Sequence, residues 1–581
     1  MRKRIAFAAV SLSCLLAGCP PQTVETQQAA MTPAEADKAA AGTTAGCAPV
    51  AGSFPPPEKL ADWANGAKLF DNLGTFHRKV TTSSPEAQKW FDQGMRLVWG
   101  FNHDESTRAF VKAGTLDPGC ASCWWGAALT MGPNYNVPML PDRAKAAYDA
   151  IGRAKAAAPK ATPVEQALIA ALDKRFAGPE PLDPVAMQPY LQAFSKAMGE
   201  VAAQYPDDLD VQVMYAETLM NLNPWKLWSL DGKAAPGTDV IVGKLESVLA
   251  KDPKHPGANH YYIHAVEASP EPGKAVASAD RLPSLMSGAG HMVHMPAHIY
   301  QRVGRYAEAE AANASGVAAD LAYMKQVTPQ GYYGIYLAHN YDFQAFSASM
   351  EGRSKSALEA QKQTGGAMPA AVLDGIPGMD FFAAKLPFVQ VRFGRWDDIL
   401  AATPPDEKYA VWTGIHRFAH AYALAAKGQL ETAEAELKAF DDYTARLPAD
   451  LAAGYNSAKD VLGVGSLLVA ARIAQGKGDK AKAVALLTDA VAREDKLSYD
   501  EPADWFFPVR HLLGAALLDA GKAKQAEAVY REDLKRNPSN GWALFGLSQA
   551  LKAQKKSTKD VDAQFQTAWK NADVTLTASA F

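Results

Sequence analysis

A glycine-containing turn recurs along the chain, and each copy is followed by a short alanine-rich segment with apolar residues three or four positions apart. That spacing is typical of amphipathic helices, and no convincing run of alternating strand residues interrupts it. The chain repeats itself with a period of about 34 residues, the length of one helical hairpin. Because one hairpin cannot bury its apolar face alone, the sequence predicts an all-α array of stacked helix pairs. The turn copies are Gly304-Arg305-Tyr306, Gly352-Arg353-Ser354, Gly394-Arg395-Trp396, Gly428-Gln429-Leu430 and Gly478-Asp479-Lys480.

Two segments show the repeat most clearly. In the first, the fourth, eighth, twenty-fourth, twenty-seventh and thirty-second positions of the tetratricopeptide repeat (TPR) are held by Trp90, Gly94, Phe110, Ala113 and Pro118. In the second, the eighth, eleventh, twentieth, twenty-fourth and thirty-second positions are held by Gly514, Leu517, Ala526, Tyr530 and Pro538. Ser106 and Asp533 depart from the alanine that the family prefers at their positions. The chain therefore resembles a TPR protein over nearly all of its mature length, which implies a TPR-type helical-hairpin solenoid, a superhelix.

The first residues are typical of an export signal. Three basic residues precede an apolar run from Ile5 to Leu16, which is too short to span a bilayer. The run ends in Leu-Ala-Gly-Cys, which resembles a bacterial lipobox and implies cleavage before Cys19 and a lipid on its sulfur. The sequence thus predicts a signal peptide at 1–18. The mature protein is expected to be a lipoprotein of the cell envelope, facing the periplasm or at the outer membrane, that contacts the membrane through its N-terminal lipid only.

Composition divides the mature chain into a tether and two lobes. Residues 19–60 are rich in Ala, Thr, Gln, Gly and Pro, which predicts a disordered tether. A weak Gly- and Pro-rich break near 362–378 predicts a boundary between two lobes. These are an N-terminal TPR-like lobe with a His-rich groove at 61–365 and a C-terminal TPR lobe at 366–581. A formal net charge of −3 and the lack of a long basic block argue against nucleic acid as a partner.

Half of the 12 histidines fall within residues 258–342. Each residue of a helix turns the side-chain direction by 100°, so residues three, four and seven positions apart share one face. Two such stripes occur in this window, one with His260, His264 and Glu267 and one with His291, His294 and His298.

The resemblance implies that these stripes face one groove. In the TPR family, positions 2, 5, 9 and 12 of the first helix face the concave side of the superhelix. Neighbouring helices lie about 8–10 Å apart, so imidazoles from adjacent helices can meet on one ion with bonds of about 2 Å. The repeat register is anchored on Asp252-Pro253, Gly304 and Gly352. It places eight polar residues at these groove-facing positions: His260, His264 and Glu267 in one repeat, His291, His294 and His298 in the next, and His339 and Asp342 in the third.

We therefore expect a metal site in the groove. Pro296 lies inside the expected helix 290–302, so the helix either kinks there or starts near Met295. The second case leaves His291 on a loop, and His291 is not counted among the expected ligands. Neutral imidazoles and a carboxylate suit Zn, Cu or Fe. The expected metal ligands are His260, His264, Glu267, His294, His298 and His339.

Two functions follow from this pattern. An ion with an open coordination position allows metal-dependent hydrolysis, and a redox-active ion allows oxidase chemistry. No motif is specific enough to indicate a catalytic residue. The alternative is a TPR scaffold that holds a peptide or protein in its groove, for protein interaction or envelope complex assembly, with no catalytic activity.

Several other residues suggest structural roles. Cys120 and Cys123 lie outside any βαβ context, so they are expected to form a structural disulfide or to remain inert thiols. His511 faces the groove alone and is expected to form hydrogen bonds. His416 and His420 fall off the groove face and are expected to pack.

Overall fold

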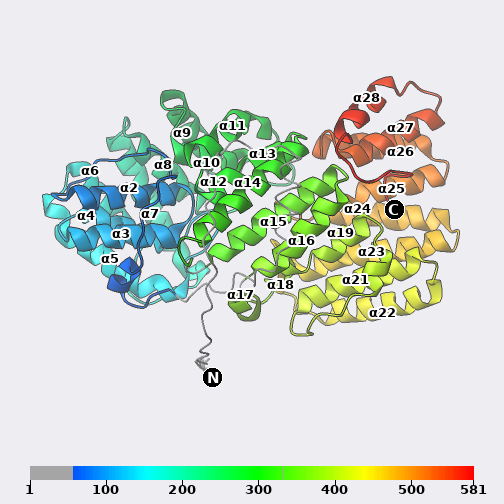
Figure 1. The fold of residues 1–581 in the computed structure, drawn as a ribbon, viewed down its shortest axis with the longest axis horizontal. Helices are drawn as coiled ribbons and strands as arrows, with labels where there is room; N and C mark the ends of the chain where they lie inside the picture. The colour runs from blue at the N-terminus through cyan, green and yellow to red at the C-terminus, as the bar shows by residue number, and fades with distance from the viewer. Residues whose placement is uncertain (1–55, 330–331, 369) are drawn as a thin grey trace, which may run out of the picture.

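The computed structural model describes residues 56–329, 332–368 and 370–581. The predicted signal peptide, the predicted lipid attachment at Cys19 and nearly all of the predicted tether lie outside these residues. Figure 1 shows an elongated array of helices that runs from the blue N-terminal half to the red C-terminal half. Among the helices of the described ranges, none combines the length and apolar character needed to cross a membrane.

The described residues form paired helices almost throughout, and helices adjacent in sequence pack against one another. The 3-10 helices are η1 (Leu60–Ala64), η2 (Pro141–Arg143), η3 (Ala158–Lys160) and η4 (Pro272–Ala275). The α-helices of the first half are α2 (Pro85–Trp99), α3 (His103–Leu116), α4 (Ala121–Thr130), α5 (Ala144–Ala157), α6 (Pro163–Asp173), α7 (Pro184–Gln204), α8 (Leu209–Met220), α9 (Thr238–Lys251), α10 (Pro256–Val266), α11 (Val276–Leu285), α12 (Gly290–His294), α13 (Pro296–Arg302) and α14 (Tyr306–Met324).

The second half continues in the same way. One short antiparallel pair, β1 (Ala452–Ala453) and β2 (Asn456–Ser457), supplies the strands of the described chain. The predicted all-α fold class is confirmed. The α-helices of this half are α15 (Tyr333–Met350), α16 (Ser354–Ala367), α17 (Ala370–Gly375), α18 (Asp380–Ala383), α19 (Leu386–Arg392), α20 (Trp396–Leu400), α21 (Ala410–Ala426), α22 (Leu430–Arg446), α23 (Ala458–Gly476), α24 (Lys480–Glu494), α25 (Val509–Asp519), α26 (Ala523–Arg536), α27 (Gly541–Ala553) and α28 (Lys559–Ala568).

The recurring glycine turns end helices, as their spacing predicts. After α13, the amide of Arg305 donates to the carbonyl of Tyr300 at 2.7 Å, which satisfies a carbonyl at the end of the helix. Each turn glycine has a positive φ, in the left-handed backbone region that glycine enters without a steric penalty. The chain can therefore turn back into the next helix within a few residues. The turn glycines with φ between +65° and +79° are Gly304, Gly352, Gly394, Gly428 and Gly478.

Packing inside the hairpins follows the TPR pattern. A Cβ atom on Gly94 would lie 2.5 Å from the ring of Phe110, and one on Gly514 would lie 2.3 Å from the ring of Tyr530. The small eighth residue therefore makes room for the aromatic twenty-fourth residue, which is the contact the resemblance implies. Ser106, which departs from the preferred alanine, donates its hydroxyl to the carbonyl of Gly94 at 2.6 Å. These contacts confirm a TPR-type arrangement of hairpins.

Apolar side chains are buried in two large groups that meet along α15. Phe343 belongs to the group that also contains Leu60 and Trp99, whereas Phe346 belongs to the group that contains Trp542. Helix α15 therefore belongs to both halves of the molecule, and it also carries His339. The lobe boundary at residues 365 and 366 stays a prediction.

Candidate metal centre

Four helices bring the histidines of the 258–342 window together. His260 and His264 lie on α10, and Glu267 caps the C-terminal end of that helix. His291 and His294 lie on α12, His298 on α13 and His339 on α15. His339 is partly exposed, whereas the other side chains of the cluster are at most 3% exposed. The sequence-predicted residues therefore share one buried place.

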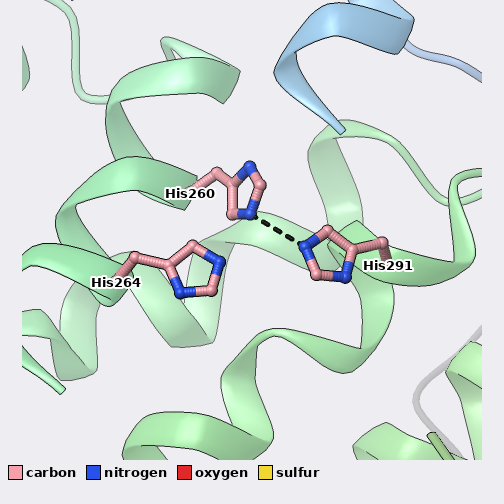
Figure 2. A group of neighbouring side chains, drawn as sticks. All are labelled: His260, His264 and His291. Atoms are coloured by element: carbon pink, nitrogen blue, oxygen red, sulfur yellow. Dashed lines mark hydrogen bonds between the residues drawn. The ribbon is translucent and has the colours of Figure 1, made fainter. Parts of the chain in front are cut away.

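The cluster consists of two neighbouring groups of three imidazoles. One group contains His260, His264 and His291, and the ligand nitrogens within it lie within 4.8 Å of one another. Figure 2 shows these three rings pointing toward one another from α10 and α12. The other group contains His294, His298 and His339 and meets the same distance limit. We name them the first and the second imidazole group.

Of the two arrangements expected at Pro296, the one that leaves His291 on a loop is wrong. Pro296 is the first residue of α13, but the preceding Gly290–His294 segment forms the separate helix α12. Met295 between them keeps helical angles, with φ −48° and ψ −33°. Proline is tolerated at the first position of a helix because its missing N–H has no partner there. The two short helices therefore preserve the side-chain register, and His291 joins the cluster.

The hydrogen bonds of the Nδ1 atoms determine which ring nitrogen faces inward. Nδ1 of His260 donates to the carbonyl of Trp99 at 2.5 Å. Nδ1 of His264 donates to the carboxylate of Glu267 at 3.0 Å. Since these oxygens only accept, each Nδ1 carries the proton, and each Nε2 of a neutral ring keeps a lone pair. Nε2 of His264 has no hydrogen-bond partner among the described residues.

The second imidazole group has the same arrangement. Nδ1 of His294 donates to Oδ1 of Asn313 at 2.9 Å, and the Asn313 amide donates to the Ala309 carbonyl, which sets its orientation. Nδ1 of His298 lies 2.8 Å from Oε2 of Glu267. The Nε2 atoms of His294 and His298 face each other at 3.1 Å. Both rings therefore direct Nε2 into the cluster.

Charge is distributed unevenly over these rings. Burial opposes a charge on His298, but Glu267 and Glu501 outweigh it and raise the pKa of His298 to about 10. In the other five rings, burial is the largest cause of a lowered pKa, and neighbouring imidazoles lower it further. The pKa lies well below its ordinary value in His260, His264, His291, His294 and His339. These five are neutral at neutral pH, which is the form that binds metals.

Glu501 belongs to the cluster although sequence reasoning missed it. It lies on the segment between α24 and α25 and contacts Nδ1 of His298. Its side chain is buried, and burial raises its pKa to about 7 against the opposing effect of His298. Glu267, His298 and Glu501 form a third group of possible ligand atoms. No repeat register could indicate Glu501, because it lies outside the helices.

Other residues highlighted by the sequence have ordinary structural partners. Asp342 shares the expected groove position but pairs with Nζ of Lys385 at 2.6 Å, with both side chains buried. His511 forms hydrogen bonds, as expected. Cys120 and Cys123 form a disulfide, one of the two expected states.

A stack of aromatic rings from three loops covers the first imidazole group. The Trp225 ring lies between Tyr135, at a centroid distance of 5.6 Å, and Tyr455, at 5.3 Å. Tyr135 lies 5.2 Å from the ring of His264. Trp225 adopts φ +60°, a backbone region that is uncommon for a residue with a side chain. The stack limits water near His264 and leaves Tyr455 as its exposed outer member.

Comparisons with known proteins yield structural likenesses. No family model matches the chain, and no curated protein matches it either. Solved structures with similar helix arrays include the human IFIT1 dimer with m7Gppp-AAAA, at 12% identity and a TM-score of 0.30, covering 90% of this chain and 96% of that one. Yeast Tom70 has 10% identity and a TM-score of 0.26, with 81% and 90% covered. The P58(IPK) TPR domain has 11% identity and a TM-score of 0.19, with 81% and 98% covered. The fold assignment rests on this chain's own hairpins.

Proposed function

We propose that the protein binds a transition-metal ion through Nε2 of His260, His264 and His291. The observation that carries this proposal is the commitment of two Nδ1 atoms to outer acceptors while the rings converge on one point. Metal-bound histidines almost always donate their other ring N–H to a carbonyl or carboxylate. A buried imidazole nitrogen without a partner, as in His264, otherwise costs free energy.

Three imidazoles leave at least one coordination position for water or a substrate. Imidazole ligands favour zinc, copper or iron over the hard cations magnesium and calcium. A bound zinc would activate water for hydrolysis, and a redox-active ion would support an oxidase. Glu267 holds the His264 ring through Nδ1 rather than facing its Nε2. Its proposed role is therefore to orient ligands, not to bind the ion directly.

The direct test is metal analysis of the purified protein after removal and reloading of metal. We expect at least one equivalent of zinc or copper in the native protein and a clear loss in His264→Ala. His416→Ala is the matched control, since His416 lies on α21 outside the cluster. Substoichiometric metal after reloading, or unchanged metal in His264→Ala, contradicts the proposal.

We also propose that the protein is anchored to the envelope by a lipid on Cys19. The test is fatty-acid labelling and membrane fractionation of the native chain beside Cys19→Ser. The native chain is expected in the labelled membrane fraction, and the variant is expected to lose the label. Equal labelling of both proteins rejects the anchor.

A second candidate function is a scaffold for a peptide or protein, and one cavity favours it. A cavity of about 550 Å³ opens between the two halves of the molecule, with charged side chains of both signs. Photo-crosslinking from Leu230, an exposed residue on its lining, should capture one defined partner, whereas Val185 on α7 should not. Equal capture at both positions rejects this function. Residues from both halves line the cavity, among them Trp228, Ser269, Arg302, Tyr499, Arg510 and Arg536.

A further inference from the structure

We infer that the protein holds a second metal ion, bound by Nε2 of His294, His298 and His339 next to the first. This inference rests on the proposed function of the first imidazole group. It turns a single-ion site into a two-ion centre. Its support comes from the second imidazole group and from the carboxylates that join the two groups.

The second imidazole group has its own ligand geometry. The ligand nitrogens of its three rings lie within 4.8 Å of one another. Asn313 and the carboxylates occupy the Nδ1 atoms of His294 and His298, and the Nε2 atoms of these two rings point at each other. Without metal, a proton lies between these two Nε2 atoms, which are 3.1 Å apart. A metal ion that replaces this proton would bind both nitrogens, and His339 completes the set from α15.

The two groups are close enough to form one centre. Ring centroids of His291 and His294 are 5.3 Å apart, and those of His264 and His298 are 5.5 Å apart. Each of these pairs contains one member of each group. Two ions bound by these groups would therefore be near neighbours, as in two-metal sites where one small ligand bridges both ions.

Glu267 links the two groups through a single carboxylate. Its Oε1 accepts from Nδ1 of His264, a member of the first group, and its Oε2 lies 2.8 Å from Nδ1 of His298, a member of the second. One side chain therefore orients a ligand of each ion.

Negative charge that can offset a buried cation lies beside the second imidazole group. Neutral imidazoles contribute no negative charge, and buried cations need compensation. Glu267 and Glu501 place two carboxylates beside Nδ1 of His298, at the edge of the proposed centre. Glu501 comes from the segment before α25, so the C-terminal half supplies half of this charge.

The same carboxylates offer another position for the second ion, between Glu267, Glu501 and Nδ1 of His298. That position leaves the nitrogens of His294 and His339 without a role. It also requires the nitrogen of His298 that already faces two acceptors. The structure therefore favours the Nε2 side, with the carboxylates in the outer shell.

The test is the copper stoichiometry of the full-length protein, with electron paramagnetic resonance as a second readout. The native protein is expected to bind two Cu²⁺ equivalents, and addition of azide as a bridging probe should weaken the signal through coupling of the two spins. His339→Ala should retain one equivalent with an uncoupled signal. His339 is partly exposed, so this change is the least disruptive to folding, and circular dichroism checks the helices.

Each outcome decides a separate point. One equivalent in the native protein, unchanged in His339→Ala, overturns the second ion but leaves the proposed function intact. No copper at all overturns the proposed function itself. Glu501→Gln should keep two equivalents with about 10–100-fold weaker binding, as expected for an outer-shell partner. Loss of one full equivalent in Glu501→Gln instead places the second ion between the carboxylates and overturns the assignment to three imidazoles.

Discussion

Helix α25 and the helix pair α12–α13 both bury histidine, with opposite consequences. In α25, Arg392 donates to Nδ1 of His511 at 2.9 Å, and Nε2 of His511 donates to Asp533 at 2.9 Å. In α12–α13, His294 and His298 instead point their Nε2 atoms at each other. The His511 ring has partners of other residue types on both nitrogens, whereas the Nε2 atoms of His294 and His298 have only each other. Partner atoms, more than burial, distinguish a structural histidine from a candidate ligand.

The largest expected effect concerns the satisfied histidine. Asp533→Ala should destabilise the protein by about 3–5 kcal/mol, because it leaves the buried guanidinium of Arg392 without its counter-charge. Chemical denaturation measures this loss. The metal content of Asp533→Ala should not change, because His511 has a structural role and lies outside the cluster. A loss of metal in this variant would contradict that distinction between His511 and the cluster.

Metal binding should stabilise the fold by a slightly smaller amount. An ion present at 100 to 1,000 times its dissociation constant stabilises the native state by about 2.7–4.1 kcal/mol. Thermal unfolding with added zinc, beside a chelator-treated sample, measures the shift. The shift should persist in His511→Ala, although that variant melts lower, and should be much reduced in His264→Ala. Equal melting with and without metal contradicts the site.

Glu267→Gln should weaken metal binding by about 10–100-fold, or about 1.4–2.8 kcal/mol. The amide can still accept from one histidine, but it loses the charge that polarises both rings. Competition with a chromophoric chelator measures the affinity. Glu271→Gln is the matched control, because Glu271 is exposed and pairs only with Lys274 within the described chain. The same loss in both variants would argue against an orienting role for Glu267.

The smallest effect is a proton count. The pKa of His298 is raised to about 10 despite burial, because Glu267 and Glu501 outweigh it, so the metal-free ring is charged at pH 8. Metal at Nε2 should release about one proton per chain, which calorimetry in two buffers of different ionisation enthalpy measures. In the metal-free protein, the raised pKa of His298 contributes stability that is fully present below about pH 6.5 and is lost as the pH rises through about 10. A His298→Gln variant that releases the same proton refutes the assignment.

Much of the candidate site could be anticipated from the repeat. Repeat anchors without any histidine, Asp252-Pro253 and Gly304, assigned His260, His264 and His298 to groove-facing positions, and these side chains lie in one buried cluster. Helical periodicity and hairpin packing are local properties, so residue spacing carries them. The presence of Pro296 led us to leave His291 out of the expected ligands. Met295 keeps helical angles between α12 and α13, however, and so preserves the side-chain register.

The remainder could not be anticipated, for physical reasons that particular residues show. Glu501 lies on an irregular segment whose position depends on how α24 and α25 pack against the first half. Asp342 shares the groove register with His339, yet it pairs with Lys385 from the region before α19. Neither contact has a signature in residue spacing, because each joins segments far apart in the chain.

The sequence by itself determined the helix order, the glycine turns and the faces on which the histidines lie, since each depends on interactions within one hairpin or its immediate neighbour. Only the tertiary structure decided which ring nitrogen points inward. Those choices rest on the Trp99 carbonyl, the Asn313 amide and two carboxylates from different halves. Folding determines the proton positions of the cluster by bringing distant acceptors to each Nδ1 atom.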